Sequence, residues 1–211
     1  MKGLIVSNGS IRDYKRLGDA IDYVNFIICA DGGLEHLIKI DIVPDLVIGD
    51  LDSISPDGLK YLEDKEIPLE KFPSIKDKTD TELAMEYLIG RGFTEIVFMG
   101  VTGSRQDHSM ANIFLLGTLL DRGIKGRIID DNNIIQIVDD YLELSPSKGH
   151  YVSLIPLSEK GIKVSLKGFF YNLDMKTIGF ASTFGISNEI IEDMGSIQIH
   201  SGKALVFISK D

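Results

Sequence analysis

The stretch LVIGDLDS, residues 46–53, decides how the chain is interpreted. Three apolar residues that follow a Pro-Asp turn signal predict a short buried strand. If the backbone stays extended beyond Gly49, the carboxylates of Asp50 and Asp52 lie on one face. Neighbouring carboxylates repel each other unless a cation or a proton joins them, and Mg²⁺ binds such acids together with substrate phosphates. The stretch indicates a metal site at a strand end, although a solvated Asp-Ser turn fits the same residues.

Strand and helix signals alternate over the first two-thirds of the chain. Expected strands cover residues 4–7, 26–30, 46–48, 69–72, 95–99 and 127–129, and expected helices cover residues 12–23, 34–38, 56–65, 79–91 and 109–120. The clearest helix opens with a capping-box pattern from Thr79 to Glu82 and closes at Gly92. This alternation predicts a Rossmann-like α/β domain over residues 1–140, with a mainly parallel sheet and flanking helices.

The pattern changes near residue 140. From there on, short β-rich runs at residues 151–155, 162–166, 196–200 and 204–208 are separated by glycines, without a long helical pattern. Such spacing is typical of a small antiparallel β-sandwich. We therefore expect a second domain over residues 141–211.

The composition narrows the possible functions. A net charge of −10 over 211 residues argues against a broad nucleic-acid-binding surface. The single cysteine, Cys29, lies in an apolar run and is expected to be a buried strand residue, so a reducing cytoplasm is the expected compartment. No signal peptide pattern and no apolar run of transmembrane length is apparent, so we expect no membrane association.

Four loops that follow expected strands combine acids with glycine, serine or threonine. They cover residues 30–33, 49–53, 76–80 and 100–108. The carboxyl ends of parallel strands meet at one edge of a sheet, where α/β proteins bind their ligands. Each loop alone also fits an ordinary turn: Thr79 and Asp80 suit a helix start, and His108 fits a helix surface as well as a general base. Together they favour a Mg²⁺–nucleotide site for phosphoryl-type transfer. The dinucleotide-binding motif G-x-G-x-x-G and the Walker motif G-x-x-x-x-G-K-[ST] do not occur, which disfavours a nicotinamide site and excludes a P-loop kinase.

The ordered motifs of these loops resemble the thiamine pyrophosphokinase family. They are DGG (31–33), PD (44–45) with GDLDS (49–53), KDKTD (76–80), GSRQDH (103–108) and, near the C-terminus, STFGISNE (182–189). The resemblance implies transfer of the pyrophosphoryl group of ATP to the hydroxyl of thiamine, which yields thiamine diphosphate and AMP. It also implies an ATP- and Mg²⁺-binding first domain, a thiamine-binding and dimerisation second domain, and a homodimer with sites at the subunit interface.

Site residues are expected in three groups. Mg²⁺ ligands, which are also catalytic, are Asp50, Asp52 and Asp80, with Arg105 catalytic as well. ATP contacts are expected from Asp31, Gly32, Gly33, Lys76, Asp77, Thr79, Thr102, Ser104, Asp107 and His108. Thiamine contacts are expected from Phe184, Ser187 and Asn188. Animal members carry a glutamine in place of Lys76 and a tryptophan near the thiamine ring; since this chain has no tryptophan, Phe184 is the candidate that stacks on the pyrimidine.

Other functions share some of these features. A haloacid-type phosphatase also uses an Asp-x-Asp strand end, with Asp50 as the nucleophile, but its usual threonine is replaced by Ile54 here. A regulatory module would bind ATP or thiamine without turnover. A structural dimerisation protein would leave the four acidic loops unexplained.

Overall fold

The computed structural model describes residues 1–72 and 77–211. The chain divides into two compact units, Met1–Asp131 and Asn132–Asp211. The division falls at residue 131 rather than at the expected residue 140, because the segment Asn133–Val138 forms a strand that pairs with the last strand of the chain.

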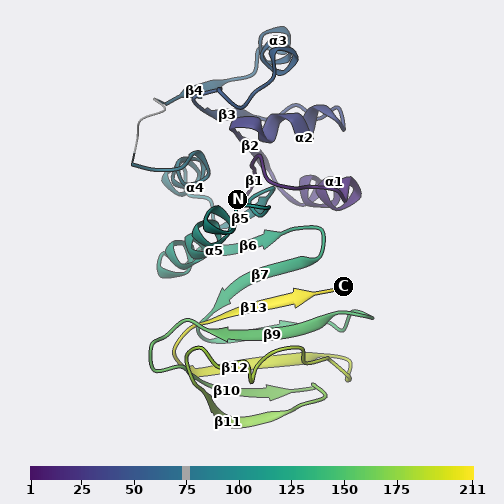
Figure 1. The fold of residues 1–211 in the computed structure, drawn as a ribbon, viewed down its shortest axis with the longest axis vertical. Coiled ribbons are helices and arrows are strands. Elements are labelled where there is room, and N and C mark those ends of the chain that lie inside the picture. Colours follow the sequence, from purple (N-terminus) through teal and green to yellow (C-terminus); the bar gives the residue numbers. More distant parts are fainter. Residues whose placement is uncertain (73–76) are drawn as a thin grey trace. The chain divides into compact units, whose positions relative to one another are not determined.

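The first unit is built on a parallel sheet (Figure 1). Its strands are β1 (Lys2–Val6), β2 (Phe26–Ala30), β3 (Leu46–Gly49), β4 (Leu69–Lys71), β5 (Glu95–Met99) and β6 (Lys125–Ile129). They lie in the order β4-β3-β2-β1-β5-β6, and every neighbouring pair is parallel. The chain therefore winds outward on both sides of β1 and β5, and the loops that follow these two strands diverge. Such a switch point is where open α/β sheets form ligand crevices.

Helices cover both faces of this sheet (Figure 1). They are α1 (Tyr14–Tyr23), α2 (Leu34–Ile38), α3 (Pro56–Asp64), α4 (Asp80–Gly90) and α5 (Gln106–Asp121), with a short 3₁₀ turn, η1 (Asp31–Gly33), before α2. The first three helices share one apolar core with alternate residues of β1, β2 and β3, and α4 and α5 pack on the opposite face. The expected cap of α4 is confirmed, since the Thr79 hydroxyl accepts a hydrogen bond from the Glu82 amide at 3.2 Å.

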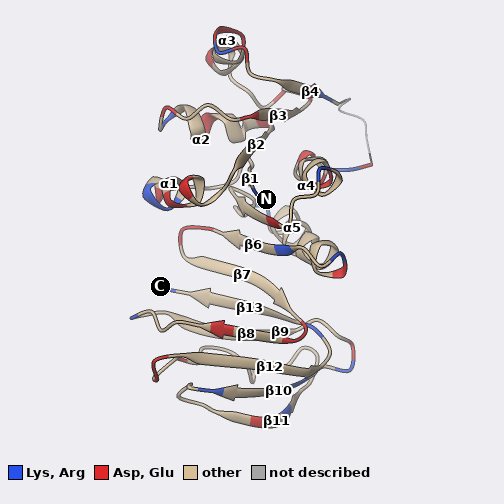
Figure 2. Cartoon of the chain, turned by 180° about the vertical axis from the view of Figure 1, so that it is seen from behind, with Lys and Arg blue, Asp and Glu red and all other residues tan. Residues whose placement is uncertain are grey.

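The second unit is antiparallel throughout its described pairings. Its strands are β7 (Asn133–Val138), β8 (Tyr141–Leu144), β9 (Tyr151–Pro156), β10 (Ile162–Lys167), β11 (Leu173–Ile178), β12 (Gly195–Ser201) and β13 (Ala204–Ser209). One layer joins β7, β13 and β9, and the other has the order β11-β10-β12-β8. The two layers enclose one apolar core with Phe169 fully buried in it. Charged residues colour α1 and α3 in Figure 2, whereas β7 and β13 carry none.

The predicted fold class is confirmed: a mainly parallel sheet with flanking helices is followed by an antiparallel β-sandwich. Three strands were not expected, namely β7, β8 and β11. The reason is clearest for β11, where four of six residues are exposed and the apolar alternation that predicts a strand is absent. Among the described residues, none of the helices combines the length and apolar character needed to cross a membrane.

Substitution of Phe169 by alanine should destabilise the second unit strongly. The side chain is 0% exposed, so its removal leaves a cavity and costs about 3–5 kcal/mol in the free energy of unfolding. The adjacent Phe170 is 63% exposed and provides a matched control, for which Phe170→Ala should cost under about 1 kcal/mol. Urea unfolding followed by circular dichroism measures both, and equal losses would contradict the burial of Phe169 in the core.

Candidate active site

A cavity of about 570 Å³ opens at the carboxyl ends of the strands of the first unit. It is lined by residues 7–9 after β1, 30–31 at the end of β2, 50 and 53 after β3, 78–81 at the start of α4, 100–105 after β5, and 108, 109 and 112 of α5. The four predicted loops thus contribute to one cavity, which lies at the switch point between β1 and β5.

Three carboxylates line this cavity and interact with one another. Asp31, Asp50 and Asp80 all line it, and the side chains of Asp31 and Asp80 are hydrogen-bonded. Burial raises the pKa of Asp31 to about 7, and the hydrogen bond to Asp80 and the charges of Asp80 and Asp50 add to this shift. The Oδ1 atom of Asp31 is buried and has no hydrogen-bond partner among the described residues. These three acids therefore favour binding of a positive charge, either a proton or a cation.

The backbone holds Asp31 in this position. Its φ angle is +46°, in the left-handed region that aspartate tolerates better than most residues. Across the sheet, a Cβ atom at Gly49 would lie 1.8 Å from Asp31 Oδ1. Only glycine at the end of β3 leaves room for this carboxylate, which explains the glycine that precedes Asp50.

The condition for placing Asp50 and Asp52 on one face, an extended backbone beyond Gly49, is not met. β3 ends at Gly49, and Leu51 has a φ angle of +70°, so the backbone turns and the period-two geometry stops. The amide of Asp52 donates to Asp50 Oδ1 at 3.1 Å, while its own carboxylate accepts from the Ser53 hydroxyl at 2.9 Å. Asp50 therefore lines the cavity, whereas Asp52 is exposed and is absent from the lining.

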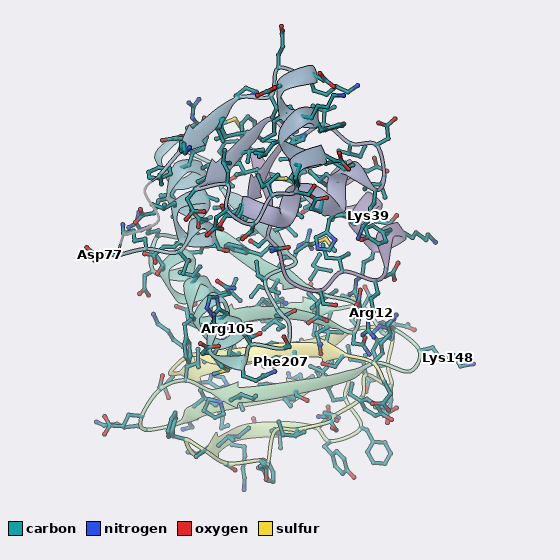
Figure 3. The ribbon with its side chains drawn as sticks, turned by 45° about the horizontal axis from the view of Figure 1, so that its top comes forward. Arg12, Lys39, Asp77, Arg105, Lys148 and Phe207 are labelled. Carbon is teal, nitrogen blue, oxygen red and sulfur yellow. The ribbon has the colours of Figure 1, made fainter. Side chains whose placement is uncertain are left out.

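Basic groups also line the cavity. Arg105 lies at the start of α5 (Figure 3) and its guanidinium binds Asp107 at 2.6 Å, which lowers the pKa of Asp107 to about 2. The helix begins at Gln106, earlier than the expected residue 109, so His108 falls in its first turn and lines the cavity. Lys78 also lines the cavity and forms an ion pair with Glu86.

Only some of the remaining predicted ATP contacts line the cavity. Thr79, Thr102 and Ser104 line the cavity. Gly32 and Gly33 are buried beneath it, where a Cβ at Gly33 would lie 2.0 Å from the Val6 carbonyl oxygen, so the structure gives them a packing role against the end of β1. Asp77 points outward (Figure 3) and Asp107 is exposed, and neither lines the cavity. Lys76 lies outside the described residues.

Sequence reasoning missed the loop after β1. Ser7, Asn8 and Gly9 line the cavity, and the Ser7 hydroxyl lies 2.9 Å from that of Thr81. Both hydroxyls are buried, as is the side chain of Asn112, whose amide donates to the Val101 carbonyl at 2.8 Å. The Ser-Asn-Gly sequence after the apolar run of residues 4–6 was an available signal, because these residue types favour a turn at the end of a strand.

The predicted thiamine contacts lie in the second unit. Phe184 is 57% exposed, and Ser187 is exposed with a φ angle of +59°. Asn188, in contrast, is buried, and its side-chain amide accepts from the Tyr171 amide at 3.0 Å and donates to the Tyr171 carbonyl at 2.8 Å. These hydrogen bonds give Asn188 a structural role: it fixes the loop that presents Phe170 and Tyr171 to solvent.

The donor set fits a metal ion that arrives with its substrate. Within the described residues, no group of three or more His, Cys, Asp or Glu side chains is arranged to hold a metal ion by itself. Mg²⁺ often uses only one or two carboxylates and completes its shell with waters and substrate phosphates. Asp50 and Asp80 meet this need, and the unpartnered Oδ1 of Asp31 lies beside them.

A parallel α/β unit with acids, helix starts and an arginine around one cavity defines a nucleotide-binding enzyme domain of the phosphoryl-transfer class. Comparison with known proteins agrees. Residues 17–128 match the family model described as thiamin pyrophosphokinase, catalytic domain, and residues 135–206 match that of the thiamin pyrophosphokinase vitamin B1 binding domain. The chain therefore belongs to the thiamine pyrophosphokinase family.

Individual relatives support this assignment. The thiamine pyrophosphokinase of Bacillus subtilis is 33% identical over 186 residues, which cover 87% of each chain. A crystal structure of thiamine pyrophosphokinase from B. subtilis superposes with a TM-score of 0.90 at 30% identity, covering 100% of both chains. That of Geobacillus thermodenitrificans gives a TM-score of 0.87 at 29% identity, covering 100% of this chain and 98% of the other. Membership in this family sets the haloacid phosphatase alternative aside.

Replacement of Asp31 by asparagine should change how stability depends on pH. Because the pKa of Asp31 is raised from 3.8 to about 7, its contribution to stability is present below about pH 4 and is lost as the pH rises through about 7. The free energy of unfolding of Asp31→Asn, minus that of the unsubstituted chain, should therefore increase between pH 4 and pH 8.

The measurement is urea unfolding across this pH range in EDTA, so that no metal ion neutralises the carboxylates. Asp22→Asn, at an exposed position of α1, provides the control. A difference between Asp31→Asn and the unsubstituted chain that stays constant from pH 4 to pH 8 would contradict the raised pKa.

Proposed function

We propose that this chain is a Mg²⁺-dependent thiamine pyrophosphokinase, which transfers the pyrophosphoryl group of ATP to the hydroxyl of thiamine and releases AMP. One observation carries the proposal: Asp31, Asp50 and Asp80, from three separate elements, converge on one cavity in the segment that matches the family's catalytic domain. Neither a regulatory binding module nor a dimerisation protein needs this costly grouping of acids.

ATP is proposed to bind with its phosphates toward the starts of α4 and α5. Thr79, Asp80 and Thr81 at one helix start and Arg105 and His108 at the other line the cavity, so both positive helix ends face it. Arg105 and Lys78 bring positive charge to the same cavity. Arg105 would meet the charge that develops on the transferred group, which suits its planar, bidentate guanidinium.

Asp50 and Asp80 are the proposed principal ligands of Mg²⁺, and Asp31 completes the negative side of the cavity. Asp52 is assigned to the same metal by the family resemblance alone. The bound ion would neutralise phosphate charge and align the transferred group. Asp31, kept close to Asp80 by its left-handed backbone and the space at Gly49, would hold the ligand carboxylate in position.

The second unit is proposed to bind thiamine and to form the homodimer, with sites at the subunit interface. Large apolar side chains are exposed on it, namely Tyr141, Ile155, Phe170, Tyr171, Met175, Phe180, Phe184, Ile186, Ile191 and Met194. Exposed apolar groups in such number suit an aromatic ligand and a partner subunit. Phe184 and Ser187 are the proposed thiamine contacts, with Asn188 acting through the loop that it fixes. The lone buried thiol of Cys29 suits a reducing cytoplasm.

The reaction predicts its nucleotide product. Incubation of the purified chain with thiamine, ATP and Mg²⁺ should yield AMP and thiamine diphosphate in equal amounts, because one pyrophosphoryl group moves intact. Separation of nucleotides by ion-exchange chromatography measures this, with omission of thiamine as the control. ADP as the sole nucleotide product would point to a monophosphate kinase, and inorganic phosphate without thiamine would point to a phosphatase.

Substitution of Asp50 by asparagine should lower kcat by about 10²–10³-fold, since it removes a carboxylate from the proposed metal site. Steady-state assays should also show a higher Mg²⁺ requirement. Asp52→Asn is the matched control two residues away, outside the cavity lining, and should lose less activity. Near-normal turnover of Asp50→Asn would remove Asp50 from the metal site, and a larger loss in Asp52→Asn would assign the main role to Asp52.

A further inference from the structure

His36 connects three elements beside the cavity without lining it. It lies on α2, three residues before Lys39, which Figure 3 labels. Its Nε2 atom is 2.8 Å from the carbonyl oxygen of Gly9, in the loop after β1, and its Nδ1 atom is 3.0 Å from the hydroxyl of Tyr14 on α1. Lys39 in turn lies over the ring of Tyr14, at 5.7 Å from its centroid.

The partners of His36 determine how its ring is protonated. A carbonyl oxygen only accepts hydrogen bonds, so Nε2 carries the proton and donates to Gly9. In the neutral ring, Nδ1 is then the acceptor for the Tyr14 hydroxyl. Burial lowers the pKa of His36 despite the hydrogen bond to Gly9, which favours this neutral form near pH 7.

Gly9 is where this connection reaches the cavity. The loop that contains it lines the cavity, and its amide donates to the Gly100 carbonyl, while the amide of Ser10 donates to the Thr102 carbonyl at 2.9 Å. A Cβ at Gly9 would lie 2.4 Å from the Gly100 oxygen, so the two backbones are in direct contact. The loops after β1 and β5 thus form one wall, and His36 binds it from outside.

We propose that His36 is a positioning residue for the nucleotide, because its hydrogen bond to Gly9 fixes the wall against which ATP binds. The inference rests on the proposed function in taking the cavity as the ATP site. Thiamine is assigned to the second unit, so the effect falls on ATP. Loss of the bond should weaken ATP binding about 3–10-fold, the factor that one net hydrogen bond contributes.

Substitution of His36 by glutamine or asparagine, whose side-chain amides differ in reach by one methylene, tests the hydrogen bond to Gly9. Glutamine places its NH₂ group near the position of Nε2 and keeps a donor for Gly9, whereas asparagine is too short to reach it. We expect His36→Gln to bind Mg²⁺-ATP within about 2-fold of the unsubstituted chain. His36→Asn and His36→Leu should bind it about 3–10-fold more weakly, and Tyr14→Phe should show a smaller change in the same direction.

Isothermal titration of Mg²⁺-ATP without thiamine gives these affinities, and steady-state assays give KM for each substrate. In His36→Asn and His36→Leu, KM for ATP should rise while KM for thiamine stays constant. The control His200→Leu, on β12 of the second unit, should change neither KM value. Equal ATP affinity in the asparagine, leucine and unsubstituted chains would overturn the inference, as would equal loss in the glutamine and asparagine variants. If the chain makes no AMP but the affinities keep this order, the proposed reaction fails and the role of His36 stands.

Discussion

Repulsion between partly buried carboxylates is the constraint on which the site depends. A parallel sheet brings the carboxyl ends of its strands to one edge, so acids that follow β2 and β3 meet the acid at the start of α4. Removing such groups from water and placing them together is unfavourable. Two residues make this grouping possible. Asp31 adopts a left-handed backbone conformation, and Gly49, which has no side chain, leaves room for the Asp31 carboxylate. Features that oppose stability in this way are typical of functional sites.

Much of this arrangement could be predicted from the sequence. The alternation of apolar runs with helical patterns indicates a parallel sheet, and strand ends that carry acids then have to meet at one edge, as Asp50 and Asp80 do. The short motifs occur in the expected order over nearly the whole chain, and they indicate the protein family. These predictions hold because they depend on periodicity and chain order, which a sequence contains directly.

Other features could not be predicted, since they depend on backbone angles and long-range contacts. The Asp-Leu-Asp sequence does not reveal that Leu51 adopts a left-handed backbone conformation. It also does not reveal that Asp50 lines the cavity while Asp52 does not. The buried hydroxyl pair of Ser7 and Thr81 joins residues 74 positions apart. Asn188 belongs to a motif that suggests ligand contact, yet its amide is used within its own unit. Polar residues near a site can thus shape it without touching the ligand.

The buried thiol of Cys29 has a practical consequence. Its side chain is 0% exposed in β2, between β1 and β3, and burial raises its pKa far above the ordinary value, so it cannot react while the sheet is closed. A thiol reagent will modify it only when neighbouring strands separate. The rate of modification of Cys29 therefore measures how often the first unit opens. The cysteine is a natural probe, so no engineered label is needed. Any small molecule that binds at the strand ends and stabilises the closed sheet will lower this rate of modification.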